Sequence, residues 1–211
     1  MWTRRMKSLI WIGLLALAAG LQLWQELQHA ESAPAAPRPG AKQSPTRQFE
    51  TLTGCRLVED RNNDGDSFKI AHERGVFEFR LYFVDAPEKR LHQFNGERID
   101  HQGGYFGGLS REQTTSIGLA AKKHTEALLG IRPFRIETRW QPVFDSGRYF
   151  GFVFFDDSGE ELGESLVRQG LARIYTEGAN LPDGRKKADF ERHLRRLEAE
   201  AKQARRGAWG L

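Results

Sequence analysis

Residues 64–88 read DGDSFKIAHERGVFEFRLYFVDAPE, and the folded part of the chain is organised around this stretch. Between positions 77 and 83 an apolar residue occupies every second position, with Glu78 and Arg80 in between. A period of two is typical of a β-strand with one buried face. We therefore predict a β-hairpin, with strands over 67–72 and 76–84 and a turn over 73–75.

The hairpin carries a carboxylate near each outer end, Asp66 and Asp85. Pairing of the two strands brings them together although nineteen positions separate them. Converging carboxylates beside Arg80 point to a divalent cation and a phosphate, because oxygen ligands suit Ca²⁺ or Mg²⁺ and a guanidinium suits phosphate oxygens. The simpler interpretation is that Asp64 and Asp66 shape a turn and that Asp85 lies in a loop ahead of a proline.

An EF-hand is the other calcium motif to consider. Residues 60–65 match the first six positions of its loop, but Ala71 stands where the loop needs a bidentate glutamate. The predicted flanks are also strands rather than helices. We therefore reject an EF-hand for this turn.

The composition is that of a globular protein, with 39% hydrophobic and 28% charged residues in a chain of 211. The formal charge is +4, but residues 1–30 hold three basic side chains and one acidic one, which leaves +2 on the rest. Overall charge is therefore weak evidence for a nucleic-acid partner. The single cysteine, Cys55, excludes an intramolecular disulfide.

Residues 1–29 carry three basic side chains ahead of an apolar run from Leu9 to Trp24, an order typical of an export signal. The run is also near the lower length limit of a membrane span. We predict a cleaved signal peptide or an uncleaved anchor, with the rest outside the cytoplasm: periplasmic, secreted or attached to the inner membrane. Pro- and Ala-rich residues 30–48 predict a flexible linker, so the domain covers 49–211.

The domain is predicted to be α+β, a five-stranded OB-type β-barrel with appended helices. Besides the hairpin, we predict strands over 51–58, 133–140 and 149–155 and helices over 111–129, 161–169 and 185–205. The glycine-rich stretch 88–109 is too irregular for assignment. Basic residues on the last helix are interpreted as a solvated surface, with a nucleic-acid contact as the alternative.

Several motifs in this order resemble the staphylococcal nuclease (thermonuclease) family. They are Asp64-Gly65-Asp66-Ser67, Arg80, Val84-Asp85-Ala86-Pro87-Glu88, Gly147-Arg148-Tyr149-Phe150-Gly151, Leu166-Val167-Arg168-Gln169-Gly170-Leu171-Ala172 and Gly207-Ala208-Trp209. The resemblance spans about 51–209, nearly the whole predicted domain.

The resemblance implies a set of site residues. Asp66, Asp85 and the backbone carbonyl of Ala86 would hold one Ca²⁺, Arg80 and Arg148 would bind phosphate, and Glu88 would position or deprotonate the attacking water. It also implies cleavage of DNA and RNA that leaves 3′-phosphate ends. The set is chemically coherent, because cations stabilise the charge that develops on a five-coordinate phosphorus.

The chain departs from the family pattern around the substrate. Ala86 replaces a frequent threonine, and Asp145 and Ser146 stand where the best-known member has a lysine and a tyrosine. Tyr175 is the candidate substrate-binding residue, although its register is shifted. In the insert 92–109, three aromatic residues could stack on bases, with a hydrophobic cluster as the alternative: Phe94, Tyr105 and Phe106.

These observations predict an exported, monomeric, Ca²⁺-dependent endonuclease that acts on DNA, RNA or both. The alternative is a non-catalytic OB-fold module that binds nucleic acid or protein and is tethered to the membrane. A phosphodiesterase for small substrates is a third hypothesis, because the nucleotide pocket differs. The intact set of five side chains favours the enzyme.

Overall fold

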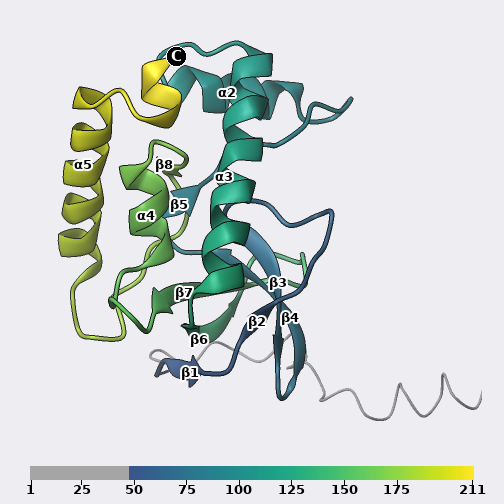
Figure 1. Cartoon of the computed structure of the whole chain (residues 1–211), viewed down its shortest axis with the longest axis vertical. Helices are drawn as coiled ribbons and strands as arrows, with labels where there is room; N and C mark the ends of the chain where they lie inside the picture. The colour runs from purple at the N-terminus through teal and green to yellow at the C-terminus, as the bar shows by residue number, and fades with distance from the viewer. Residues whose placement is uncertain (1–47) are drawn as a thin grey trace, which may run out of the picture. The chain divides into compact units, whose positions relative to one another are not determined.

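The computed structural model describes residues 48–211 (Figure 1). The predicted signal peptide or anchor over 1–29 lies outside these residues, and so does the predicted linker except for Gln48. Both stay predictions. None of the helices within residues 48–211 combines the length and the apolar character needed to cross a membrane.

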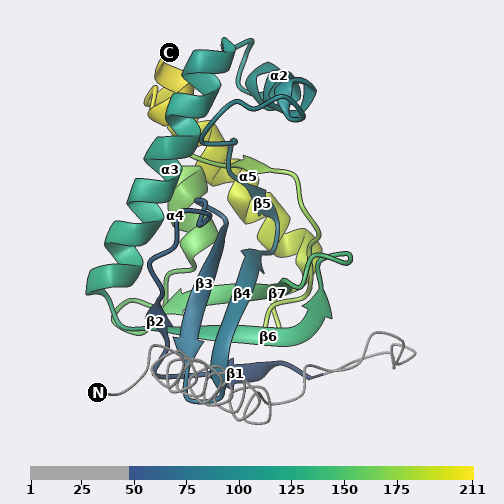
Figure 2. The same cartoon turned by 90° about the vertical axis from the view of Figure 1, so that its right-hand side faces the viewer.

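A six-stranded sheet forms the frame of the domain, in the order β1-β6-β7-β4-β3-β2. Its strands are β1 (Glu50–Leu52), β2 (Arg56–Leu57), β3 (Ser67–His72), β4 (Gly75–Leu81), β6 (Phe134–Pro142) and β7 (Tyr149–Phe155). Strands β4 and β7 are parallel, and all other neighbours are antiparallel. Figure 2 shows the β3–β4 hairpin running across β6 and β7.

The predicted strand over 51–58 is wrong as one element, because the chain bends within it. Its first part, β1, pairs with β6, and its second part, β2, pairs with β3. The bend contains Gly54 at φ 68°, a conformation that a residue with a Cβ rarely adopts. Residues 50–57 therefore supply both β1 and β2, the strands at the two ends of the sheet order.

The hairpin is confirmed, with Ser67 opposite Arg80. Its second strand was predicted to reach Val84 but ends at Leu81. Phe83 takes a positive φ of 66°, which breaks the alternation. The chain then enters β5 (Val84–Asp85), which pairs with β8 (Arg173–Ile174) in a separate two-stranded sheet. Because of this break, Asp85 pairs with Arg173 on β8 instead of extending the β3–β4 hairpin.

Residues 48–211 contain five helical segments: α2 (Gly96–Tyr105), α3 (Arg111–Ile131), α4 (Leu162–Arg168), α5 (Lys187–Gln203) and the 3₁₀ turn η1 (Gly207–Gly210). The predicted helices over 111–129, 161–169 and 185–205 are confirmed with small shifts at their ends. A capping box between Ser110 and Gln113 starts α3. Helix α2 lies in the stretch that the sequence left unassigned.

Helix α5 packs on the sheet through an aromatic cluster. The ring of Phe152 on β7 lies 6.3 Å from that of Phe190 on α5 and 4.8 Å from that of Tyr82. Phe83 also contacts Phe190, with ring centroids 5.1 Å apart. The positive φ of Phe83 thus directs its ring into the core.

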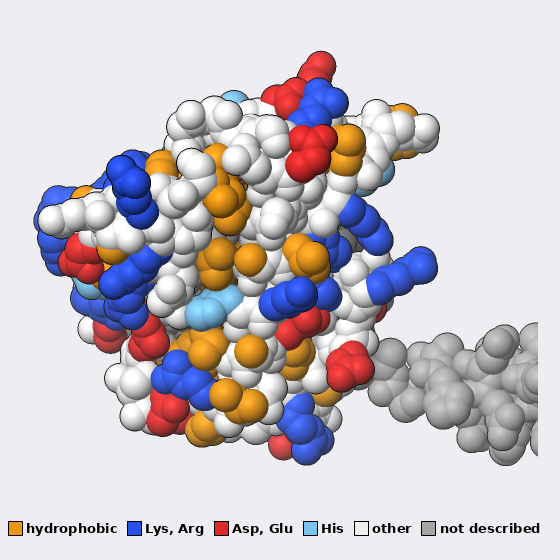
Figure 3. Space-filling model, turned by 45° about the horizontal axis from the view of Figure 1, so that its top comes forward, with side chains coloured by type: hydrophobic (Ala, Val, Ile, Leu, Met, Phe, Trp, Pro, Cys, Tyr) orange, Lys and Arg blue, Asp and Glu red, His pale blue; other side chains and the backbone are white. Residues whose placement is uncertain are grey.

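Basic side chains gather on the outer face of α5 (Figure 3), and several of them pair with carboxylates of the same helix. Arg192 pairs with Asp189, and Lys202 lies 3.0 Å from Glu198. Arg195 lies 3.4 Å from Glu191. Such pairs three or four residues apart stabilise an exposed helix and use the charge of these basic residues within it, which supports a solvated surface over a nucleic-acid contact.

Candidate active site

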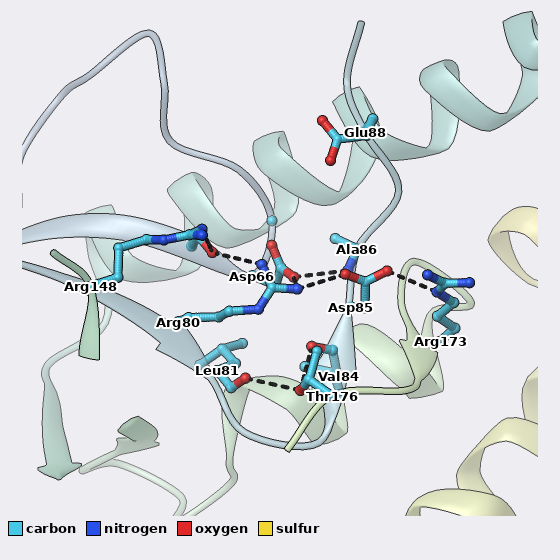
Figure 4. Close-up of polar contacts among 12 residues, drawn as sticks. Asp66, Arg80, Leu81, Val84, Asp85, Ala86, Glu88, Arg148, Arg173 and Thr176 are labelled. Carbon is cyan, nitrogen blue, oxygen red and sulfur yellow. Dashed lines mark hydrogen bonds and ion pairs between the residues drawn. The ribbon is translucent and has the colours of Figure 1, made fainter. Parts of the chain in front are cut away.

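The two predicted metal ligands converge on one arginine (Figure 4). Nη2 of Arg80 lies 3.0 Å from Oδ2 of Asp66 and 2.6 Å from Oδ1 of Asp85. The backbone N–H of Ala86 donates to Oδ2 of Asp66 at 3.2 Å. Both carboxylates are buried, with residue exposures of 3% for Asp66 and 1% for Asp85.

The surroundings shift the pKa values of the two carboxylates in opposite directions. Burial raises the pKa of Asp66 to about 6, although the Arg80 guanidinium acts against it. Burial alone would also raise the pKa of Asp85, but Arg80, Arg98 and Arg173 together outweigh it and hold that pKa below its usual value. Asp85 is therefore the firmly charged member of the pair.

Arg148 joins the same cluster from a distant turn. It precedes β7, which pairs in parallel with β4 and so places Phe150 opposite Arg80. Nη1 of Arg148 donates to Oγ of Ser67 at 3.2 Å, and Nη1 of Arg80 donates to the same oxygen at 3.4 Å. One serine hydroxyl therefore marks where the two predicted phosphate-binding arginines meet.

Glu88 lies apart from this cluster in Figure 4. Its Oε1 forms an ion pair with Nε of Arg98, 2.8 Å away, and its side chain is about a quarter exposed. Its backbone N–H donates to Oε1 of Gln102 at 3.0 Å. Glu88 is thus held by two side chains of α2.

A close approach between α3 and the Pro87–Glu88 segment sets the position of Glu88. A Cβ added to Gly118 would lie 2.4 Å from the carbonyl oxygen of Pro87 and 2.5 Å from that of Glu88. Such contacts leave no room for any side chain. Gly118 therefore allows α3 to support the loop that carries Glu88.

Three residues that the sequence did not single out complete the surroundings of Asp85. Nε of Arg173 lies 2.8 Å from its Oδ2, and Nη2 of Arg98 lies 3.0 Å from its Oδ1. Nε2 of Gln102 donates to Oδ2 at 3.0 Å and to the carbonyl of Ala86 at 3.2 Å. Arg173 directly follows a recognised motif, whereas Arg98 and Gln102 belong to the unpredicted helix α2.

The candidate aromatic residues separate into two groups. Tyr175 is 57% exposed, and the guanidinium of Arg173 lies 3.9 Å from its ring centroid, beside the site. Phe94 is 85% exposed. Tyr105 and Phe106 instead contact each other and Trp209, which supports the hydrophobic-cluster alternative for these two.

The acidic turn ahead of Asp66 is held by lysines. Asp60 lies 2.6 Å from Nζ of Lys69, and Asp64 lies 2.6 Å from Nζ of Lys89. Lys122 on α3 donates to the carbonyl of Asn63 at 2.9 Å. These contacts explain the residues of the EF-hand-like turn as structural.

The donors present suit a hard cation. Asp66 and Asp85 offer oxygens within 3.0 Å of a single cationic nitrogen, and the adjacent Ala86 carbonyl keeps a free lone pair beside its bond from Gln102. Within residues 48–211 no group of three or more His, Cys, Asp or Glu side chains is placed to hold a metal ion. The two carboxylates and the carbonyl would hold one Ca²⁺ with water completing its coordination.

Two buried carboxylates beside two arginines that share a hydroxyl define a class of site that suits phosphate esters. The family of staphylococcal nuclease homologues matches residues 78–210, so the chain belongs to this family. The predicted family is thereby confirmed, together with a mixed α+β domain. The match includes Arg80, Asp85, Glu88 and Arg148 and begins after Asp66. Members of the family are generally Ca²⁺-dependent nucleases.

Proposed function

We propose that this protein is an exported, Ca²⁺-dependent endonuclease that hydrolyses phosphodiester bonds of DNA, RNA or both and leaves 3′-phosphate ends. The observation that carries the proposal is the meeting of Arg80 and Arg148 at Oγ of Ser67, beside the buried Asp66–Asp85 pair. Family membership supports the reaction class. The apolar leader within residues 1–29 supports export.

The side chains divide the reaction between them. Arg80 and Arg148 bind the phosphate and stabilise the negative charge that builds up on its oxygens. Glu88 accepts a proton from water, whose oxygen bonds to phosphorus as the bond to the 5′ oxygen breaks, and the departing 5′ oxygen takes up a proton from solvent. Bound Ca²⁺, held by Asp66, Asp85 and the Ala86 carbonyl, would supply further charge neutralisation. A 3′-phosphate and a 5′-hydroxyl result.

The domain architecture and state of assembly are part of the proposal. Because β1 and β2 are joined by only three residues and border both ends of the sheet order, we propose that the sheet closes as an OB-type barrel. Tyr175 is proposed to contact the substrate, since its exposed ring lies over Arg173. The domain is proposed to act as a monomer.

Digestion of single-stranded DNA with CaCl₂ or EDTA tests the proposal, with end-group analysis of the products. Arg80→Ala should lower kcat/KM by a factor of at least about 100, since one transition-state donor is worth about 2.7–4 kcal/mol. Glu88→Gln should lower it by about 100- to 10,000-fold, the usual contribution of a general base. Arg192→Ala on the outer face of α5 is the control. Full activity in EDTA, or in both site variants, contradicts the mechanism.

The second candidate function is a tethered binding module without catalysis. The observation that favours it is that Asp85 already contacts Arg80, Arg98 and Arg173, which neutralise it without a cation. Tight oligonucleotide binding with no cleavage in Ca²⁺, Mg²⁺ or Mn²⁺ would support this candidate.

N-terminal sequencing of the exported protein would show whether the leader is cleaved.

A further inference from the structure

Helix α2 places one arginine between two carboxylates of different predicted roles. Arg98 contacts Oδ1 of Asp85 through Nη2 at 3.0 Å and Oε1 of Glu88 through Nε at 2.8 Å. Its side chain is 48% exposed, whereas those of Arg80 and Arg173 are 10% and 3% exposed. Of the three arginines on Asp85, Arg98 alone faces solvent to this degree.

A cation at Asp85 has to compete with these donors. Oδ1 accepts from Arg80 and Arg98, and Oδ2 accepts from Arg173 and Gln102. Removing a partner from buried Arg80 or Arg173 would leave a desolvated charge unpaired, which is costly. Arg98 can turn into water at little cost, because exposed ion pairs contribute little. Arg98 is therefore the donor that a bound cation displaces.

A displaced Arg98 has an anion to bind close by. The cluster holds Asp66, Asp85 and Glu88 against Arg80, Arg98, Arg148 and Arg173, so without substrate its formal charge already favours an anion. Release of Arg98 adds a planar donor group that matches phosphate oxygens. It also frees Oε1 of Glu88 for water.

We propose that Arg98 is a third phosphate-binding arginine, which is held by Asp85 and Glu88 in the resting site and is released toward the substrate phosphodiester when Ca²⁺ binds Asp85. This inference rests on the proposed function and deepens it. The helix that carries Arg98 thus becomes part of the active site. In the free protein Arg98 competes with Ca²⁺ for Asp85. In the substrate complex Arg98 and Ca²⁺ both neutralise charge on the phosphodiester.

This dual role predicts two effects of opposite sign for Arg98→Gln. The Kd for Ca²⁺ without nucleic acid should fall by about two- to fivefold, because an exposed competitor is removed. The KM for single-stranded DNA at saturating Ca²⁺ should rise by about tenfold or more, because a charge-assisted contact to phosphate is lost. If Arg98 has only a structural role, Arg98→Gln should weaken both Ca²⁺ binding and substrate binding, or change neither.

Arg111→Gln is the matched control. The Arg111 side chain is 47% exposed and ties α3 to α2 through Asp100 at 2.6 Å, without contacting the site. Losing that ion pair tests whether loosening α2 alone reproduces the effects. Arg98→Lys keeps the charge without the planar fork, so its KM should lie between those of wild type and Arg98→Gln.

The experiment is calorimetric titration with CaCl₂ alone, followed by steady-state cleavage of a single-stranded oligonucleotide, on the full domain of each variant. Tighter Ca²⁺ binding with a raised KM in Arg98→Gln, and neither in Arg111→Gln, supports the inference. If wild type binds Ca²⁺ and cleaves DNA but Arg98→Gln shows no change in Kd or in KM, or weaker Ca²⁺ binding, the inference alone is overturned. Wild type that neither binds Ca²⁺ nor cleaves overturns the proposed function as well.

Discussion

Nε of Arg173 donates to Oδ2 of Asp85 at 2.8 Å, and the two side chains are 3% and 1% exposed. The residues face each other because β5 pairs with β8, with Asp85 opposite Arg173 in the register. Arg173 also extends over Tyr175 and contacts Nδ1 of His101 at 3.0 Å. This ion pair and the contacts of Arg173 therefore connect β5, α2 and the segment that follows α4.

Replacing Arg173 with alanine should destabilise the domain strongly. Breaking a buried ion pair leaves an uncompensated charge and typically costs about 3–5 kcal/mol. Asp85 keeps Arg80 and Arg98, so we expect about 3 kcal/mol in the free energy of unfolding, measured in urea. Arg192→Ala, which removes an exposed ion pair on α5, should cost less than about 1 kcal/mol. Equal stability of the two variants would contradict a structural role for the buried pair.

Gln102 should act on catalysis by positioning. Its side chain is fully buried and contacts Asp85, the carbonyl of Ala86 and the backbone N–H of Glu88. Outer-shell partners of metal ligands typically contribute about 10–100-fold to metal affinity or activity, so Gln102→Met should lower kcat by that factor while KM changes less.

Gln203→Met at the exposed end of α5 is the control for that variant. Gln102→Glu offers a further comparison, because it keeps the acceptor for Glu88 but places a carboxylate against Asp85. It should weaken activity at least as much as Gln102→Met. A loss confined to KM in both variants would show that Gln102 does not position the reacting groups.

The hairpin was predictable because its apolar residues follow the strand period and its turn is compact. Its end was not, because the positive φ of Phe83 depends on the packing of that ring against Phe190 rather than on a local preference. The consequence is large. The break at Tyr82 and Phe83 creates β5, which brings Asp85 to Arg173, a pairing that no spacing in the sequence indicates.

Helix α2 was missed for a different reason. It contains Gly103 and Gly104, and glycine is a poor helix former, so propensity argues against a helix here. Tertiary packing overrides it: Ile99, Gln102 and Gly103 are buried, and a Cβ on Gly103 would lie 2.5 Å from the carbonyl oxygen of Leu109. Because the helix was not predicted, its site residues Arg98 and Gln102 were not predicted either. Arg148 was predicted because its motif lies within five consecutive residues, 147–151.

The stability of the domain should depend on pH through Glu161. This residue is 1% exposed at the start of α4, and burial, followed by the charge of Glu164, raises its pKa to about 8. The folded state then binds a proton that the unfolded state releases above its pKa of about 4.5. Stability should therefore fall as pH rises from about 5 through 8, on the order of 1 kcal/mol per pH unit.

Glu161→Gln tests this dependence, because the amide stays neutral and can still accept the N–H of Glu164. Urea unfolding of both proteins between pH 5 and 9 should show the variant gaining stability relative to wild type as pH rises. Glu191→Gln, on α5 with a side chain 43% exposed, should leave the pH dependence of wild type unchanged. Parallel curves for wild type and Glu161→Gln would contradict a neutral, buried Glu161.

Two glycines of α3 should respond to alanine in opposite ways. Gly130 has no atom within 4 Å of an added Cβ, so Gly130→Ala should stabilise the helix by about 0.5–1 kcal/mol. At Gly118 the new Cβ would meet the carbonyl oxygens of Pro87 and Glu88 at 2.4 and 2.5 Å. Backbone atoms have to move there, which typically costs about 1–3 kcal/mol.

The displaced segment carries Glu88, so Gly118→Ala should reduce activity beyond its effect on folding. A displacement of about 1 Å at a reacting group can cost about 100-fold, so kcat should fall at least tenfold at temperatures where the variant is fully folded. Activity assays paired with thermal unfolding of both alanine variants separate the two effects. Normal kcat in folded Gly118→Ala would mean that contact with α3 does not set the position of Glu88. A loss seen only in Gly118→Ala would show that the close contact at Gly118, where α3 meets the carbonyls of Pro87 and Glu88, sets the position of Glu88.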